Sequence, residues 1–280
     1  MKRIVTAILA GLLAVSGTAA VSAAAKVDGR ATCEAYIADV TVDGKIDDVW
    51  KYAPNYDANF VKAFEASYYK DTMKAGVDYA DMDVKVLWNG KNTLYVLAVV
   101  KDPKIHNNST SQWLNDSVEM FLELNNANDS SKKPTQHRLG ADGKQSGSTK
   151  SPFLSSAAAK TADGWIGEFA YDVSAVGGAG QYLGIEFQYN DAILGDKKRQ
   201  VCLGWGDKEN KAFSDASKMG QCLLSSTKVA DLKAAETTKA AETVKKPETP
   251  ASPATFDASV LLAVAAAAAG TGTVIFRKKK

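Results

Sequence analysis

Two-residue alternation between positions 83 and 100 constrains the fold more than any other feature of the chain. Asp83 to Trp88 and Thr93 to Val100 both show this period and are rich in Val, Leu and aromatic residues. The four residues between them, Asn89-Gly90-Lys91-Asn92, contain Asn-Gly, which favours a tight turn. The pattern predicts a β-hairpin.

Five more strands are predicted downstream, each bounded by Gly, Asn, Asp or Pro. Many short strands with turn residues between them favour two packed antiparallel sheets. We therefore expect an all-β fold, a β-sandwich of jelly-roll or immunoglobulin-like type, in one domain from 30 to 226. The five strands are expected at Ser117 to Leu124, Gly164 to Tyr171, Tyr182 to Asn190, Gln200 to Trp205 and Gly220 to Leu224.

Residues 1–25 have the layout of a cleavable signal peptide. Lys2 and Arg3 precede an apolar run from Ile4 to Val15, and small residues ending in Ser22-Ala23-Ala24-Ala25 follow. We expect export and a mature chain that begins near Lys26.

The C-terminal part changes composition twice. Residues 227–251 are rich in Ala, Glu, Thr, Lys and Pro and hold no aromatic residue, which is typical of a stalk, here with partial helix from Val229 to Val244. Residues 258–276 are uncharged, mostly apolar and long enough to cross a bilayer. The basic cluster Arg277-Lys278-Lys279-Lys280 should then stay cytoplasmic.

A pentapeptide, Ser252-Pro253-Ala254-Thr255-Phe256, stands just before this apolar run. The order of pentapeptide, apolar run and basic tail resembles a Gram-positive sortase sorting signal, whose usual form is Leu-Pro-any-Thr-Gly. Ser252 replaces Leu and Phe256 replaces Gly. The resemblance implies that a sortase-type transpeptidase cleaves after Thr255 and joins the chain to the cell wall. A permanent membrane anchor is the alternative, and both predict a domain at the cell surface.

The chain is slightly acidic once its two targeting segments are set aside. Its 34 basic and 32 acidic residues become 28 and 31 without residues 1–25 and 256–280, which hold six basic residues and one acidic residue. Nucleic acid is therefore not an expected partner. Three cysteines are too few for a disulfide scaffold, although Cys202 and Cys222 fall in late strand-like segments and could pair across a sheet.

One large aromatic residue falls in a polar loop. Trp113 is surrounded by Asn, Ser, Thr and Gln and stands directly before the strand-like run Asp116-Ser117-Val118-Glu119. A Trp with so little apolar company is a candidate contact surface rather than core. Four tryptophans in or beside strand-like patterns are expected in the core instead: Trp50, Trp88, Trp165 and Trp205.

Motifs along residues 41–224 carry a family resemblance. The run from Val42 to Trp50 is close to "DGxIDxxW". Six shorter matches follow in order: Val86-Leu87-Trp88, Leu94-Tyr95-Val96, Val100-Lys101-Asp102-Pro103, Asp116-Ser117-Val118-Glu119, Asn190-Asp191-Ala192 and Ser217-Lys218-Met219-Gly220. In this order and spacing they resemble the family 9 carbohydrate-binding modules, accessory domains of xylanases.

The resemblance implies a β-sandwich that binds sugar chain ends between two aromatic rings without cutting them. Trp113 matches the first ring, and Phe213 falls where the second is normally Trp. The polar partners carried over by position are Glu119, Gln136, Arg138 and Asn210, whose amide, carboxylate and guanidinium groups suit sugar hydroxyls. The expected ligands are cello-, xylo- or related oligosaccharides, and no catalytic residue is expected.

These residues also have simpler explanations. Phe213 could pack its own loop, Glu119 could be a solvated carboxylate on the outer face of its strand, and Arg138 could pair with a nearby acid. Asp43, Asp47 and Asp48 could be turn and capping residues, or could hold a structural Ca²⁺ ion.

Three other functions stay open. A glycoside hydrolase would need Asp116 and Glu119 as its carboxylate pair, but residues three apart in one strand point to opposite faces. A haem-binding sandwich would have to use His106 and His137, both expected in polar loops. A wall-anchored adhesin that binds protein requires only that the sandwich has lost sugar binding.

Overall fold

The predicted hairpin is the first confirmed element. In the computed structural model, which describes residues 24–56, 61–65, 80–148 and 150–244, β3 (Asp81–Trp88) pairs antiparallel with β4 (Thr93–Lys101) along its whole length. The Asn89 side chain closes the turn, because its Oδ1 accepts the backbone N–H of the three residues that follow Gly90. Gly90 adopts φ +76°, a conformation that suits Gly.

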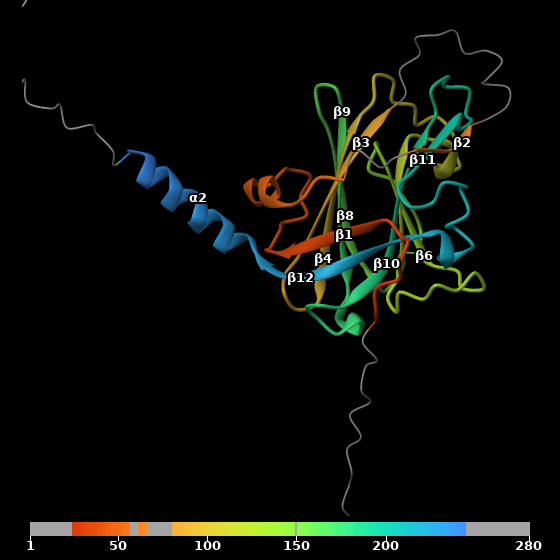
Figure 1. The fold of residues 1–280 in the computed structure, drawn as a ribbon. Coiled ribbons are helices and arrows are strands. Elements are labelled where there is room, and N and C mark those ends of the chain that lie inside the picture. Colours follow the sequence, from red (N-terminus) through yellow and green to blue (C-terminus); the bar gives the residue numbers. More distant parts are fainter. Residues whose placement is uncertain (1–23, 57–60, 66–79, 149, 245–280) are drawn as a thin grey trace, which may run out of the picture. The chain divides into compact units, whose positions relative to one another are not determined.

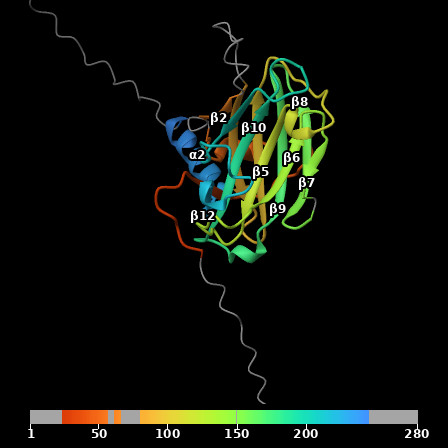
Figure 2. The ribbon, with the colours of Figure 1, turned by 90° about the vertical axis from the view of Figure 1, so that its right-hand side faces the viewer.

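The strands form two packed layers, so the predicted all-β sandwich is confirmed (Figures 1 and 2). Within each layer neighbouring strands are hydrogen-bonded. One layer holds β3, β4, β9 (Gly164–Asp172) and β8 (Phe153–Lys160); the other holds β7 (Gln145–Gly147), β6 (Thr135–Gly140), β5 (Ser117–Glu123), β10 (Tyr182–Asp191), β11 (Val201–Gly204) and β2 (Val61–Glu65).

The two layers are joined by a seam that the sequence did not predict. β12 (Gly220–Lys228) pairs antiparallel with the first half of β10, and β1 (Thr32–Ile37) pairs parallel with both β12 and β3. The expectation of purely antiparallel sheets is therefore wrong at β1. Strands from opposite ends of the chain meet here, and no local pattern in either one records that pairing.

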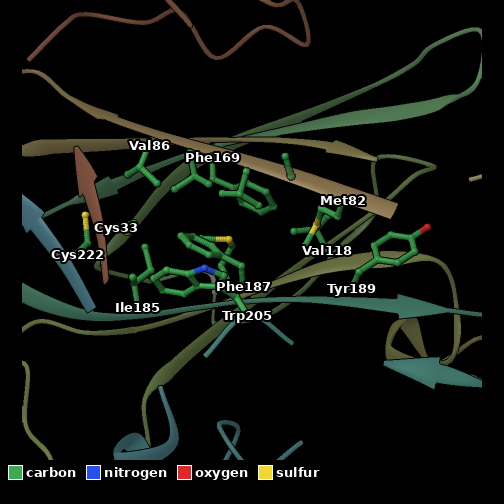
Figure 3. Packing of buried hydrophobic residues seen from close by; sticks show 14 of the residues in the cluster. Cys33, Met82, Val86, Val118, Phe169, Ile185, Phe187, Tyr189, Trp205 and Cys222 are labelled. Atoms are coloured by element: carbon green, nitrogen blue, oxygen red, sulfur yellow. The ribbon is translucent and has the colours of Figure 1, made fainter. Parts of the chain in front are cut away.

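The core lies between the layers and is rich in Val, Leu and aromatic side chains (Figure 3). All four strand-associated tryptophans are at most 1% exposed, so their expected core role is confirmed. β5 and β10 are buried on both faces. Their core faces carry apolar residues such as Met120 and Phe187, whereas their outer faces carry polar residues that loops cover.

The five downstream strands are confirmed to within a few residues at each end, whereas β1, β2, β6, β7 and β8 were missed.

The partial helix is α2 (Val229–Val244), which follows β12 directly. It contacts the sandwich where the Tyr52 hydroxyl donates to Glu236, at 2.7 Å. Single 3₁₀ turns are η1 (Asp48–Tyr52), η2 (Gln112–Leu114), η3 (Ser174–Val176) and η4 (Ala216–Lys218).

The targeting segments lie almost wholly outside the described residues. This holds for the signal peptide up to residue 23, for the sorting pentapeptide, and for the apolar run and basic tail. Among the helices that the structure does describe, none combines the length and apolarity needed to cross a bilayer.

The cysteines are arranged differently from the pairing considered from the sequence. Cys222 on β12 stands directly opposite Cys33 on β1. Cys202 belongs to β11, where its register partner in the sheet is Asn190 of β10. All three are buried free thiols. The parallel seam, invisible in the sequence, decides which two cysteines are neighbours.

Gly220, at the start of β12, allows a close approach that a larger residue would prevent. A Cβ added there would stand 2.2 Å from Cζ3 of the buried Trp205 ring and 2.9 Å from the carbonyl oxygen of Ala31. We predict that Gly220→Ala lowers the free energy of unfolding by about 1–3 kcal/mol, because ring or strand must shift in a packed core. Urea denaturation followed by Trp fluorescence measures this.

Gly184→Ala on the neighbouring strand β10 is the matched control. Its added Cβ would have nearest neighbours at 3.3 Å, which small adjustments relieve. Equal destabilisation by the two substitutions would show that close packing of Trp205 on Gly220 is not the cause.

Candidate functional site

Two aromatic side chains singled out by the sequence stand half exposed on loops. Trp113 belongs to η2, Phe213 lies in the loop between β11 and β12, and each is 47% exposed. Both line one open pocket of about 380 Å³. The structure thus brings all six expected ligand-binding residues together, with Arg199 in addition: the rest of the lining is Glu119, Gln136, Arg138, Arg199 and Asn210.

The strands β5 and β6 place the charged groups of the pocket. Glu119 stands directly opposite Arg138, and Gln136 is two residues earlier on the same face of β6. Arg138 Nε donates to Glu119 Oε1 at 2.5 Å, and Gln136 Nε2 donates to Oε2 at 2.9 Å. Glu119 is only 3% exposed, so the idea of a solvated carboxylate is wrong. Arg138 does pair with an acid, and that acid lies in the same pocket.

Asn190 on β10 ties a third strand to this ion pair. Its Nδ2 donates to Glu119 Oε1 at 2.7 Å and to Ser117 Oγ at 3.1 Å. Both oxygens of Glu119 are therefore occupied by side chains of neighbouring strands. The carboxylate is held in one position, with the guanidinium and amide groups of the pocket arranged around it.

A buried aspartate shapes the loop that carries Phe213 and Asn210. Asp207 is fully buried, and its carboxylate accepts the backbone N–H of Lys211 at 2.5 Å and of Ala212 at 2.6 Å. Ala212 packs inward against Phe121 of β5. With the loop fixed at Asp207 and Ala212, Asn210 and Phe213 are left to line the pocket.

The polar residues around Trp113 serve their own loop. Asn115 is fully buried and bonds Ser109 in both directions, accepting from its N–H at 2.8 Å and donating to its carbonyl at 2.9 Å. Asp116 accepts the backbone N–H of His106 and of Ala192. The loop is therefore held by internal hydrogen bonds and needs no packing from Trp113, whose ring is left at the surface.

Arg199 is the lining residue that the sequence did not reveal. Its guanidinium carbon lies 4.8 Å from the centre of the Phe64 ring and 5.6 Å from that of Trp113. Its Nη1 donates to Asn190 Oδ1 at 2.5 Å. In the sequence it follows two lysines in a charged loop, and nothing in that pattern sets it apart.

Carboxylates that could hold a cation lie away from the positions considered for Ca²⁺. Asp43 forms an exposed ion pair with Lys45, and Asp47 accepts the N–H of Thr41. In the described part of the chain, one group of three buried aspartates brings oxygens within 4.8 Å of one another: Asp102, Asp116 and Asp191.

Burial raises the pKa of all three aspartates, and repulsion by neighbouring carboxylates adds to the rise at Asp116 and Asp191. Burial is the larger cause, and it brings the pKa of Asp116 to about 8 and that of Asp191 to about 7. Both oxygens of Asp102 and of Asp116 already accept hydrogen bonds from the protein. Asp102 and Asp116 therefore hold the backbone of nearby loops in place, through the N–H groups of Lys104, His106 and Ala192.

The two histidines do not form a pair of axial ligands in this arrangement. His137, expected in a polar loop, instead lies on β6, buried with its ring stacked 4.7 Å from Phe153. Burial lowers the pKa of His137 to about 4. His106 lies in the loop after β4, where its ring faces Gly195.

Curated relatives match this chain over its sandwich. It is 33% identical over 189 residues to endo-1,4-beta-xylanase C of Paenibacillus barcinonensis, covering 66% of this chain and 16% of that protein. It is also 33% identical over 201 residues to exoglucanase XynX of Acetivibrio thermocellus, covering 70% and 17%. The chain thus spans only about a sixth of the length of these relatives.

Solved structures show the same fold. A carbohydrate binding module family 9 from Caldicellulosiruptor kristjanssonii in complex with glucose aligns with a TM-score of 0.60 at 21% identity, covering 70% of this chain and 96% of that one. Its complex with cellotriose aligns with a TM-score of 0.59.

The family model agrees with both comparisons. It is described as "Carbohydrate family 9 binding domain-like" and matches residues 42–227, well over half of the chain. This range ends within β12 and contains every residue that lines the pocket. The chain belongs to the carbohydrate family 9 binding domain-like family.

Proposed function

We propose that this domain binds the ends of polysaccharide or oligosaccharide chains, holding a sugar ring between Trp113 and Phe213. The observation that carries the proposal is the pocket itself, where two half-exposed rings and a fixed set of amide and charged groups line one space. A sugar presents apolar C–H faces to rings and hydroxyls to polar groups. The solved family member in complex with glucose and cellotriose supports ligands of this class.

The arrangement favours binding over cleavage. A hydrolase needs two carboxylates that flank one bond. Asp116 is fully buried with both oxygens bonded to backbone N–H groups, and Glu119 is held in its ion pair. Only Glu119 lines the pocket. The xylanase relatives match over the sandwich alone, which fits an accessory rather than a catalytic role.

The size of the site sets the expected affinity. Two stacked rings contribute ~1 kcal/mol each beyond the burial of their surface, and four hydrogen bonds contribute ~1–2 kcal/mol each. Together these amount to roughly 6–10 kcal/mol before ordering costs. This corresponds to micromolar dissociation constants at the tightest. We further propose that the protein is exported and anchored at the cell surface by its C-terminal signal, where many copies would bind a polymer firmly.

We predict that Trp113→Ala weakens binding at least about thirtyfold, because a central aromatic contact is worth about 2 kcal/mol or more. Calorimetric titration of the exported chain, residues 26–255, with cello-, xylo- and mannooligosaccharides measures this. Leu154→Ala is the matched control, since Leu154 is also about half exposed but does not line the pocket. Absence of binding across the whole panel would favour a protein-binding adhesin.

Phe213→Trp is predicted to tighten binding of the same ligand about threefold, because indole offers a larger face and an N–H donor. Phe213→Ala should weaken it. The ratio of the two dissociation constants, measured on one ligand, tests whether this ring contacts the sugar. An unchanged affinity in both variants would remove Phe213 from the clamp.

A further inference from the structure

Arg199 has an unusual environment for a charged residue. Its guanidinium lies against two aromatic rings, Phe64 and Trp113, and within the described residues it donates a hydrogen bond to the neutral amide oxygen of Asn190. Its Nε is enclosed and has no hydrogen-bond partner. Within the residues that the structure describes, no carboxylate forms an ion pair with it.

The other charges of the pocket cancel. Glu119 and Arg138 form a mutual ion pair, and Gln136, Asn210 and the two rings carry no charge. The lining therefore holds one positive charge that no lining residue offsets. Glu209, directly before Asn210 in the chain, forms ion pairs with Lys211 and Lys218 and does not line the pocket.

A guanidinium in this setting is suited to a ligand carboxylate. Its planar fork of N–H donors matches the two oxygens of a carboxylate, and the pair is stronger than a bond to a neutral hydroxyl. The rings of Phe64 and Trp113 cover part of the guanidinium, and a charged hydrogen bond that is partly shielded from water is stronger than a fully solvated one. A neutral sugar would offer Arg199 only hydroxyl acceptors, which bind a guanidinium less strongly than a carboxylate does.

We propose that Arg199 makes this pocket prefer a sugar that carries a carboxylate over its neutral counterpart. This inference rests on the proposed function, because it assigns the ligand class of the same pocket. The carboxylate could belong to a uronate unit of a polysaccharide or to an aldonate at an oxidised chain end. The two share the chemistry that Arg199 recognises and differ in where the carboxylate stands on the sugar.

Calorimetry with the exported chain separates these cases through three matched disaccharides. They are cellobiose, the aldonate obtained by oxidising its reducing end, and the disaccharide in which glucuronate replaces its non-reducing glucose. At low salt we expect one of the two acids to bind about tenfold more tightly than cellobiose, the range of a charge-assisted hydrogen bond. The advantage should shrink in high salt, while cellobiose binding should not respond.

Two variants assign the effect to Arg199. Arg199→Gln should bring the acid-to-neutral affinity ratio close to one, and Arg199→Lys should retain part of it by keeping the charge without the planar fork. Lys197→Gln removes a positive charge from the same loop, at an exposed residue outside the pocket, and should leave the ratio unchanged. Thermal unfolding of each variant checks that it is folded.

The outcomes separate this inference from the proposed function. Cellobiose binding with no advantage for either acid, or an advantage that survives in Arg199→Gln, would overturn the role of Arg199 and leave sugar binding intact. No binding of any of the three, with none across the wider oligosaccharide panel, would overturn the proposed function itself.

Discussion

The pocket depends on the buried carboxylate of Glu119. It accepts hydrogen bonds from Arg138, Gln136 and Asn190, which belong to two different neighbours of its own strand. A carboxylate this deeply enclosed is stable only when its oxygens are satisfied, so the three donors are fixed along with it. Asn190 then bonds Arg199, which lies against Trp113. The charge of Glu119 thereby fixes the polar side chains that line the pocket and, through Arg199, contacts the ring of Trp113.

The carboxylate of Glu119 can be enclosed because β5 and β10 are buried on both faces. Their core faces are apolar and pack between the layers, whereas their outer faces carry polar residues covered by the Trp113 and Phe213 loops. Those loops are fixed by buried side chains of their own, Asn115 and Asp207, which take up backbone N–H groups. The rings are free to stay half exposed because loop stability does not rest on them.

Much of this could be predicted from local patterns. The Asn89-Gly90 hairpin and the central strands follow from period two and turn chemistry. β8 was missed because Ser155 to Lys160 consists of Ser, Ala and Lys and has no β-branched or aromatic residue. β1 was missed because its partners, such as Leu87 on β3 and Gln221 on β12, lie far along the chain. His137 was expected in a loop because its neighbours Thr135, Gln136 and Arg138 are also polar, and such a run resembles a loop in the sequence. Only the packing of neighbouring elements shows that His137 is buried.

The sequence by itself determined the sandwich, because strand periodicity is a local property of the chain. Its ordered motifs determined the resemblance to the family, and that resemblance in turn implied the six residues that meet in one pocket. Only the tertiary structure decided how those residues interact. It shows that Glu119 is a buried carboxylate bonded by three side chains, not a surface one. It also places Cys33 rather than Cys202 beside Cys222, and it places Arg199 against Trp113. Each is a contact between segments distant in sequence, which packing and burial create and no single segment encodes.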